Sequence, residues 1–321
     1  MIKLSICIPV YNMDIYLDEA LKSISHELAN FPEVKSLVEV CISNNASSDK
    51  TADVIQKWKQ SLPIIAHENE MNLGCDQNFI DVINMASGQY CWYLGGDDAL
   101  LTGALRKVFS LLDKCLDIIL ANRTECDKSL NPMRINLWLR GHRQYWNTKK
   151  ISDQVDYLRR IKSMGGLFSY LSSLLFRKDA WTQVDYQNKF TGTGYSHVSM
   201  MLGMFKQGVR LWYCEESLVL CRDNDVFSSA FGSTNRLILD LRGYGAFIEH
   251  FFPDSQNVVH REMLRVIRRD HGMKNVASFR SREEDSGKWG EVEPYLKFFK
   301  YPGWFIFFMR NRKFAKWFAR F

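Results

Sequence analysis

The chain has 321 residues, of which 46% are hydrophobic and 24% charged, a composition that excludes an intrinsically disordered protein. It carries 42 Lys and Arg against 36 Asp and Glu, a formal net charge of +6. Seven basic and no acidic residues follow Pro294, so the rest of the chain has 35 basic against 36 acidic side chains. Because the positive charge belongs to an aromatic-rich tail and not to a sheet surface, we do not expect nucleic-acid binding.

Strand-like and helix-like patterns alternate through the first 120 residues. Apolar β-rich runs predict five strands, at residues 3–9, 37–43, 64–66, 90–94 and 117–121. Helical spacing between them predicts four helices, at residues 14–28, 50–59, 72–86 and 105–112. This order implies an α/β fold with a mostly parallel sheet, right-handed crossovers and flanking helices.

The remainder of the chain is less regular. The pattern breaks down at residues 123–150, which is typical either of a substrate loop or of a solvated surface loop with packed aromatics. A Gly-rich loop at residues 190–197 leads into a Met-rich helix, and residues 211–221 predict another strand. We therefore predict an α/β domain at residues 1–225 and a helical C-terminal region at 226–321.

The eight cysteines and the N-terminus bear on the cellular compartment. The cysteines are scattered without a C-x-x-C pair, and Cys7, Cys41 and Cys91 lie in apolar runs, which favours a reducing cytoplasm and argues against structural zinc. Met1 leads directly into a strand without the layout of a signal peptide. No stretch approaches the roughly 20 apolar residues needed to cross a bilayer.

Two adjacent carboxylates, Asp97 and Asp98, follow the strand at residues 90–94 after a Gly-Gly pair. Ligands of open parallel sheets bind outside the carboxyl ends of the strands, and carboxylates there suit Mg²⁺ or Mn²⁺. The alternative is that one of them only caps the next helix. Tyr11 and Asn44 follow the first two strands, so polar residues converge at this edge and favour a binding site. Neither a P-loop nor a dinucleotide fingerprint is present.

Four segments resemble the motifs of the inverting family 2 glycosyltransferases, which have the GT-A (Rossmann-like) fold. They cover about the first 100 residues in the family's order: Ile8-Pro9-Val10-Tyr11-Asn12, Asn44-Asn45-Ala46-Ser47-Ser48-Asp49, Asn72-Leu73-Gly74 with Asn78, and Gly88-Gln89-Tyr90. The residues of these motifs are most similar to those of a subgroup that adds dideoxyhexoses such as abequose to lipopolysaccharide O-antigen units.

The resemblance implies a nucleotide-diphosphate sugar as donor. Pro9 would shape the exit of the first strand, Tyr11 would border the base, and Asn44 and Asn78 would meet the base or ribose. Asp97, aided by Asp98, would hold Mg²⁺ or Mn²⁺ against the diphosphate. The family's D-x-D motif has its first Asp where this chain has Gly95, so metal binding rests on the later carboxylates. Arg222 would hold phosphates or form a structural ion pair.

The family's catalytic Asp lies in an E-D pair at the start of a later helix, and Ser196-His197 falls on that pair. A neutral imidazole can accept a hydroxyl proton at pH 7, so His197 is the candidate general base. The alternative is that His197 only caps or packs. Loss of two family carboxylates also motivates a second hypothesis, a non-catalytic membrane-peripheral scaffold.

Asn44 predicts the base of the donor. The family's carboxylate at this position can accept the N3–H of uracil, whereas an Asn amide can donate to N3 of cytosine. We therefore expect a CDP-linked 3,6-dideoxyhexose, with a UDP- or dTDP-sugar as the alternative.

The tail from Tyr295 contains twelve aromatic and seven basic residues. It predicts either an amphipathic helix on the anionic inner face of the cell membrane or a final helix docked on the domain. A peripheral membrane location would suit a polyprenyl-diphosphate-linked oligosaccharide as acceptor.

Overall fold

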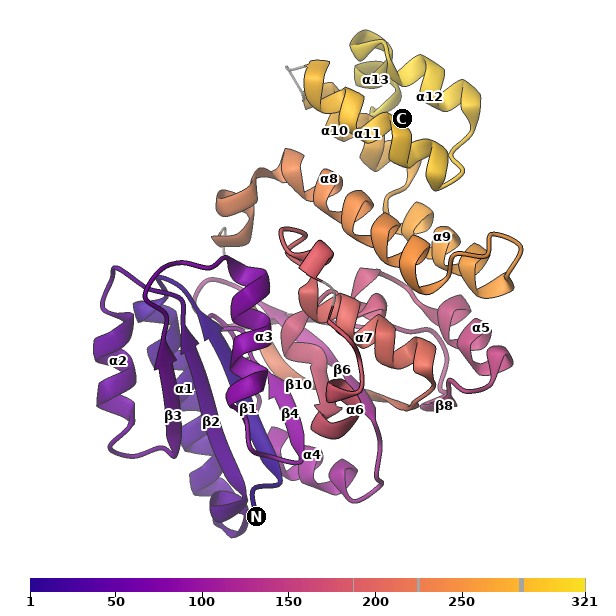
Figure 1. The fold of residues 1–321 in the computed structure, drawn as a ribbon. Helices are drawn as coiled ribbons and strands as arrows, with labels where there is room; N and C mark the ends of the chain where they lie inside the picture. Colours follow the sequence, from indigo (N-terminus) through magenta and orange to yellow (C-terminus); the bar gives the residue numbers. More distant parts are fainter. Residues whose placement is uncertain (187, 224–225, 283–285, 321) are drawn as a thin grey trace.

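The computed structural model describes residues 1–186, 188–223, 226–282 and 286–320. These residues form one mixed sheet in the order β3-β2-β1-β4-β9-β6-β10-β5, with β7 beside β6 and β8 beside β10 (Figure 1). The strands are β1 (Leu4–Val10), β2 (Val38–Asn44), β3 (Ile64–Glu68), β4 (Tyr90–Tyr93), β5 (Ala99–Leu100), β6 (Ile118–Cys126), β7 (Pro132–Asn136), β8 (Tyr145–Asn147), β9 (Leu174–Arg177) and β10 (Arg210–Arg222).

Helices cover both faces of the sheet, as the alternation of predicted elements required. The first four are α1 (Asp14–Asn30), α2 (Thr51–Trp58), α3 (Cys75–Met85) and α4 (Ala104–Leu112), followed by α5 (Ile151–Arg160), α6 (Lys178–Thr182) and α7 (Ser196–Gln207). Along β1, Ile6 and Ile8 belong to the core shared with α1 and α4, whereas Cys7 belongs to the core shared with α3 and α7. Successive side chains thus enter different layers, which is the period of a strand.

The N-terminal half of the sheet is parallel, as predicted. β1 lies between β2 and β4 and is parallel to both, and β3 continues this order on the outer side of β2. All three crossovers contain a helix, which parallel strands need.

The second half of the sheet departs from the predicted alternation. The short strand β9 inserts between β4 and β6 and is antiparallel to both, while β6 and β10 are parallel. The segment at residues 123–150 is not one irregular loop, because it completes β6 and then forms β7 and β8. Its charged and apolar residues alternate because β7 is an exposed strand, on which Met133 and Ile135 face solvent.

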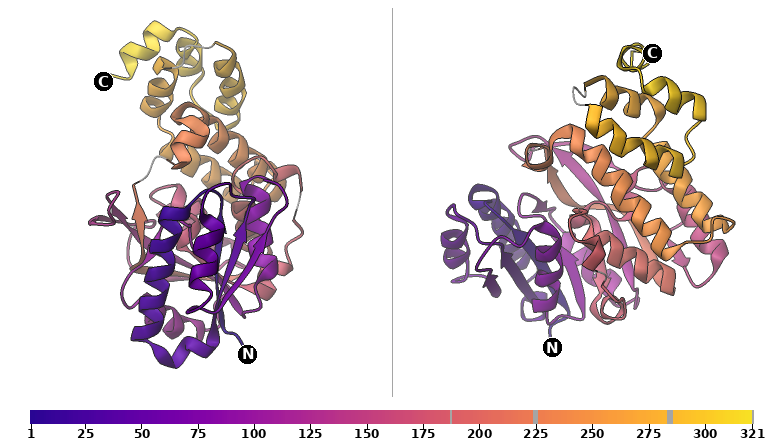
Figure 2. Two further views of the ribbon diagram at one scale, coloured as in Figure 1. Left: turned by 90° about the vertical axis from the view of Figure 1, so that its left-hand side faces the viewer. Right: turned by 45° about the horizontal axis from the view of Figure 1, so that its top comes forward.

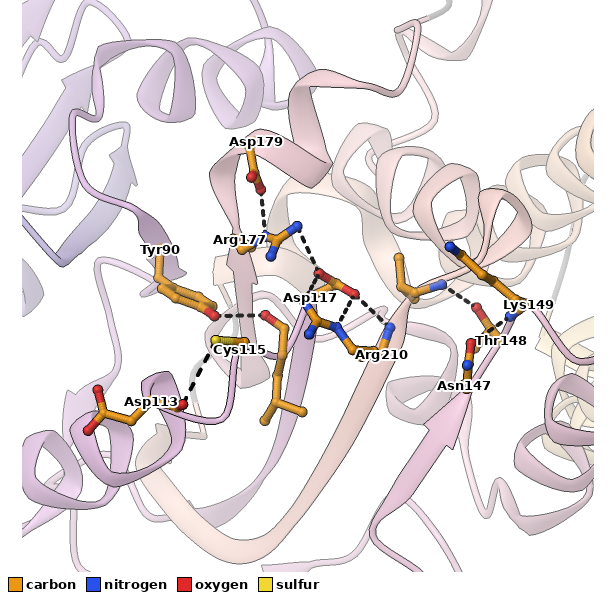
Figure 3. Close-up of polar contacts among 12 residues, drawn as sticks. Tyr90, Asp113, Cys115, Asp117, Asn147, Thr148, Lys149, Arg177, Asp179 and Arg210 are labelled. Carbon is orange, nitrogen blue, oxygen red and sulfur yellow. Dashed lines mark hydrogen bonds and ion pairs between the residues drawn. The ribbon is translucent and has the colours of Figure 1, made fainter.

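Asp117 fastens the edge of the sheet opposite the carboxyl ends of β1 and β4 (Figure 3). Its carboxylate lies 3.2 Å from the guanidinium groups of both Arg177, at the end of β9, and Arg210, at the start of β10. It also accepts the backbone N–H of Arg210, and the hydroxyl of Tyr90 donates to the carbonyl of Leu116 at 2.9 Å. These bonds hold β4, β9, β6 and β10 in register.

The C-terminal helices form two layers above α7 (Figures 1 and 2). The first contains α8 (Val226–Phe251) and α9 (Val258–Asp270), and the second contains α10 (Met273–Arg282), α11 (Ser286–Phe298), α12 (Gly303–Met309) and α13 (Arg312–Phe318). The proposed division at residue 225 falls outside the described residues. None of the described helices is both long enough and apolar enough to span a membrane.

The tail forms two short helices and not the single helix expected. Asn311 separates them, because its side-chain oxygen accepts the backbone N–H groups of Lys313 and Phe314 and so starts α13. Phe305, Met309 and Ala315 are buried, so one side of the pair docks on the protein.

Candidate functional site

The loops that follow β1 and β2 are joined by hydrogen bonds. Asn12, whose backbone has a φ of 53°, accepts the N–H of Ser48 at 2.8 Å and donates its own N–H to Ser47 Oγ at 2.9 Å. Asp49 accepts the N–H of Asp14 at the start of α1, which joins the same two loops again. Pro9 is buried within β1, and Tyr11 stands at the rim with 43% of its surface exposed.

Asn44 is buried at the end of β2, with 1% of its surface exposed. Its Oδ1 accepts both the backbone N–H and the hydroxyl of Ser47, which fixes the orientation of the amide. Its Nδ2 has no hydrogen-bond partner among the described residues. The side chain therefore holds an unused donor at the edge of the sheet.

Asn78 is the second predicted contact of the base or ribose, and it lies on α3. Its Nδ2 donates to the carbonyl of Val10 at 3.3 Å, and its Oδ1 has no partner among the described residues. Asn44 lies two residues after Ile42 on β2, so both belong to the face of the sheet that α1 covers. The opposite face is covered by α3. The structure thus brings both to the same sheet edge, but from opposite layers.

Asn45 organises the neighbouring loop, a role that the sequence did not indicate. Its Nδ2 donates to Asn72 Oδ1 at 2.8 Å and to the carbonyl of Gly74 at 3.2 Å, and its Oδ1 accepts from Leu73 N at 2.9 Å and Asn69 Nδ2 at 3.0 Å. The amide is saturated by the segment at residues 69–74, so Asn45 fixes the entry to α3. The sequence signal that could have indicated this role is a second Asn, Asn45, directly after Asn44, together with the later Asn72-Leu73-Gly74 sequence.

Gly95, Asp97 and Asp98 form a turn after β4. The N–H of Asp98 donates to the carbonyl of Gly95 at 3.1 Å, and the N–H of Gly95 donates to Ser172 Oγ at 2.8 Å. A Cβ on Gly95 would lie 2.9 Å from both Asp97 Oδ1 and Asp98 Oδ2. Two carboxylate oxygens thus converge on a space that a side chain would fill, which explains why glycine occupies this position.

Asp98 is buried and held by two hydroxyl groups. Its Oδ2 accepts from Tyr170 at 2.6 Å and from Ser172, while Arg123 stacks 4.2 Å from the Tyr170 ring. Burial, and then the charge of Asp97, raise the pKa of Asp98 to about 7, against the lowering effect of the two hydroxyl groups. Asp98 therefore keeps its proton to a higher pH than an exposed Asp does.

Arg222, at the end of β10, is occupied by protein acceptors. Its Nε donates to the carbonyl of Asp97 at 3.2 Å, and its other nitrogens bond the carbonyl of Lys128 and the carboxylate of Glu19. Its guanidinium also lies 5.0 Å from the ring of Tyr16. These contacts fit the structural ion pair, the second of the two predicted roles, and make Arg222 a positioning residue for the Asp97 turn.

His197 is packed at the start of α7 with 3% of its surface exposed. Its ring lies 5.1 Å from Phe79 and 6.3 Å from Tyr93, and neither ring nitrogen makes a hydrogen bond with the described residues. Burial lowers the pKa of His197 to about 3, partly offset by the backbone of Ser169. The imidazole is thus a weak base in this conformation, and its packing against Phe79 and Tyr93 fits the alternative that His197 only packs.

Asp76 holds the Gly-rich loop before His197, a function that the sequence did not reveal. Its buried carboxylate accepts the backbone N–H groups of Gly192 at 2.7 Å, Gly194 at 2.9 Å and Ser196 at 2.7 Å. The two glycines have φ values of +88° and +71°, which other residues rarely adopt. The sequence offers only a weak signal for this role: the N–H groups of a Gly-rich loop need an acceptor, and Asp76, at the start of α3, is one of the carboxylates that could supply it.

Comparison with known proteins identifies the family. The model of "Glycosyl transferase family 2" matches residues 5–173. Abequosyltransferase RfbV of Salmonella typhimurium is 38% identical over 263 residues, which cover 79% of this chain and 76% of that protein. The chain is a family 2 glycosyltransferase.

Other relatives of this glycosyltransferase are more distant. The GalNAc(5)-diNAcBac-PP-undecaprenol beta-1,3-glucosyltransferase of Campylobacter jejuni is 34% identical over 105 residues, 32% of each chain. Staphylococcus aureus TarS 1–349 in complex with UDP-GlcNAc has a TM-score of 0.71 at 13% identity, covering 99% of this chain and 91% of that one. The mannosyltransferase PcManGT of Pyrobaculum calidifontis, in complex with GDP-Man and Mn²⁺, has a TM-score of 0.56 at 12% identity, covering 99% and 86%. At these identities the two structures support the GT-A-like fold.

The carboxylates of this glycosyltransferase fit a metal ion whose other ligands come from a bound substrate. Across residues 1–186, 188–223, 226–282 and 286–320, no three His, Cys, Asp or Glu side chains are grouped as an all-protein metal site. Mg²⁺ and related ions are commonly held by one or two carboxylates together with substrate phosphates. Asp97 and Asp98, converging beside Gly95, supply that number of carboxylates.

Proposed function

We propose that this glycosyltransferase transfers a 3,6-dideoxyhexose such as abequose from a CDP-sugar to a lipid-linked oligosaccharide in O-antigen synthesis, with inversion at the anomeric carbon. Its similarity to abequosyltransferase RfbV supports this sugar and this pathway. A polyprenyl-diphosphate oligosaccharide is the acceptor that we propose. The single structural observation that carries the donor assignment is the unused Nδ2 of Asn44.

The orientation of the Asn44 amide favours cytosine over uracil. Because Oδ1 is engaged by the N–H of Ser47, the amide presents Nδ2, a donor, and not its oxygen. N3 of cytosine is a hydrogen-bond acceptor and can pair with Nδ2. N3 of uracil carries a hydrogen, so two donors would face each other. A buried mismatch of this kind costs roughly 1–3 kcal/mol, which corresponds to a preference of about tenfold to a hundredfold.

The proposed reaction is a single in-line displacement at the carboxyl ends of the strands. The acceptor oxygen bonds to the anomeric carbon, the bond from that carbon to the diphosphate breaks, and the nucleoside diphosphate leaves with the electron pair. Asp97 and Asp98 would hold Mg²⁺ or Mn²⁺, which when bound neutralises charge on the diphosphate. Pro9 and Tyr11 would shape and border the base site, with Asn78 near the ribose, while Arg222 positions the Asp97 turn.

His197 is the proposed acceptor of the proton from the attacking hydroxyl. Both ring nitrogens are buried and have no hydrogen-bond partner among the described residues, so the acceptor hydroxyl would have to reach one of them, and burial makes the imidazole a weak base. The negative charge of a bound donor would favour the imidazolium and raise the pKa of His197 towards the range needed for proton transfer.

The donor proposal is tested by measuring binding of CDP and UDP to the unaltered protein by calorimetry. We expect CDP to bind at least about tenfold more tightly, and Asn44→Asp to reverse the preference. Ser47→Ala is the companion variant, because loss of the hydroxyl loosens the amide and should reduce the discrimination without reversing it. Equal affinities in the unaltered protein, or a UDP preference, would leave a UDP- or dTDP-sugar donor and remove the argument from Asn44.

A second candidate function is a non-catalytic scaffold with the same fold. The absence of a family carboxylate at Gly95 and the burial of His197 favour it. Incubating the purified protein with CDP-abequose and Mn²⁺ separates the two, because an enzyme of this family should release CDP slowly by hydrolysis. Donor binding without any release of CDP, with or without acceptor, would support the scaffold.

A further inference from the structure

Four large aromatic side chains are exposed on the last two helices. The exposed fractions are 51% for Trp304, 64% for Phe307, 43% for Phe308 and 54% for Trp317, and we call these four residues the aromatic face. They come from α12 and α13, which belong to the outer layer of helices α10 to α13 (residues 273–282 and 286–318), here called the lobe. Phe314 links the two helices, because its ring lies 4.7 Å from that of Phe308 and 5.3 Å from that of Trp317. Exposed aromatic groups of this size indicate an interaction surface when they gather together.

The aromatic face is not needed to hold the lobe together. Phe305, Met309 and Ala315, on the opposite side of the same helices, are buried, and α13 packs on α10. Trp304 and Phe307 flank the buried Phe305 in the sequence, so α12 is apolar on both its inner and its outer side. The outer side has no covering element among the described residues.

Exposed cations lie on the same C-terminal segment as the aromatic face. Lys300, Lys313, Lys316 and Arg320 are exposed, and no acidic residue follows Glu293. Glu293 itself is occupied, because Arg310 lies 2.6 Å and Lys297 3.0 Å from its carboxylate. Aromatic groups together with Lys and Arg match the boundary of an anionic bilayer, where rings enter the interface and cations meet the headgroups.

The lobe stands on the side of the molecule towards which β1 and β2 run. In both Figure 1 and the left view of Figure 2, the N-terminus is at the bottom and α12 and α13 are at the top. The carboxyl ends of the parallel strands, where Asn44 and the Asp97 turn lie, therefore face the same side as the lobe. The candidate site and the C-terminal helices thus lie towards the same end of the molecule.

We propose that the aromatic face and the exposed cations of the same segment dock this chain on an anionic bilayer, with the carboxyl ends of the strands turned towards the lipid surface. The proposal replaces the single interfacial helix expected from the sequence with a folded lobe whose inner side is fixed and whose outer side binds lipid. It does not depend on the identity of the donor or acceptor, because the contact is made by the lobe alone.

The test is cosedimentation of the full chain with vesicles of phosphatidylglycerol and phosphatidylcholine at low and high salt. We expect binding to the anionic vesicles at low salt, weaker binding at high salt, and little binding to pure phosphatidylcholine. The variant Trp304→Ser/Phe307→Ser/Trp317→Ser should lose at least about tenfold in binding. Lys313→Gln/Lys316→Gln should lose about fivefold or more per cation removed and show a weaker salt dependence.

Met133→Ser/Ile135→Ser is the matched control, because these apolar residues are equally exposed but lie on β7. It should bind vesicles as the unaltered protein does, and circular dichroism should show that all variants are folded. The proposal is overturned if the full chain ignores anionic vesicles at low salt, or if the aromatic-face and β7 variants lose binding equally. A dimer in light scattering that the aromatic-face variant abolishes, without vesicle binding, would assign the surface to a second copy instead.

Discussion

Asp98→Asn should stabilise the metal-free protein at alkaline pH, although Asp98 is a candidate metal ligand. Burial and Asp97 raise the pKa of Asp98 from its usual 3.8 to about 7. Between these values the folded protein holds a proton that the unfolded chain has released, so the stability of the unaltered protein falls as the pH rises. An Asn side chain can still accept from Tyr170 and Ser172 and carries no charge to bury.

The size of the expected stability difference depends on how much of the range between pKa 3.8 and pKa 7 the measurements cover. Each pKa unit corresponds to about 1.36 kcal/mol, and from pH 5 to pH 7 the change spans two units. The stability of Asp98→Asn relative to the unaltered protein should thus increase by about 3 kcal/mol between pH 5 and pH 8. The increase should level off between pH 7 and pH 8, because the group becomes ionised in the folded state as well.

Urea unfolding at pH 5, 6, 7 and 8, with EDTA present, measures this difference directly. Titrating groups that are common to both proteins cancel when the two free energies of unfolding are subtracted. A difference that does not change with pH, or that decreases towards pH 8, would refute the assignment of a raised pKa to Asp98. Addition of Mn²⁺ and donor should instead favour the unaltered protein, because the variant lacks one carboxylate.

The remaining predictions concern the other parts of the site. Gly95→Ala should lower kcat/KM by at least about tenfold, because its Cβ meets two carboxylate oxygens at 2.9 Å, whereas Gly290→Ala, with open space around it, should not. Asp76→Ala should lower the free energy of unfolding by about 3 kcal/mol in urea titrations, since it leaves three N–H groups without their acceptor. His197→Ala should lower kcat by about a hundredfold and leave CDP affinity unchanged; full activity would place the base elsewhere. Asp97→Ala should weaken Mn²⁺-dependent donor binding in calorimetry, and an unchanged metal dependence would contradict its role.

The parallel half of the fold was predictable because its signals are local. Runs such as the one ending at Pro9 alternate with helical periodicity, and a parallel sheet follows from that order alone. The insertion of β9 between β4 and β6 was not predictable, because a four-residue apolar strand can pair on either side and its neighbours are distant in sequence. A different reason hid β7 and β8: their exposed positions carry apolar residues, so the alternation typical of a half-buried strand is missing.

The candidate site was predictable in its location but not in the state of its side chains. Strand-end residues such as Asn44 and Asp97 are found at the expected edge. Burial and Asp97 raise the pKa of Asp98, whereas Tyr170 and Ser172, which are more than 70 residues away, lower it, and the contacts of Arg222 depend on Glu19. Sequence patterns identify which residues can take part, whereas burial and distant partners decide what each one does.

The position of β9 has a consequence for how the protein can fold. The family model ends at residue 173, one position before β9 begins, and β4 and β6 are joined only through that strand. A fragment ending at residue 173 would leave β4 with an open edge, which invites aggregation. The bond between Arg222 and Glu19 closes a separation of 203 residues, so the contact of Arg222 with the carbonyl of Asp97 can form only after β10 has been synthesised. The sheet of the N-terminal half is therefore completed only by strands that follow it in the sequence.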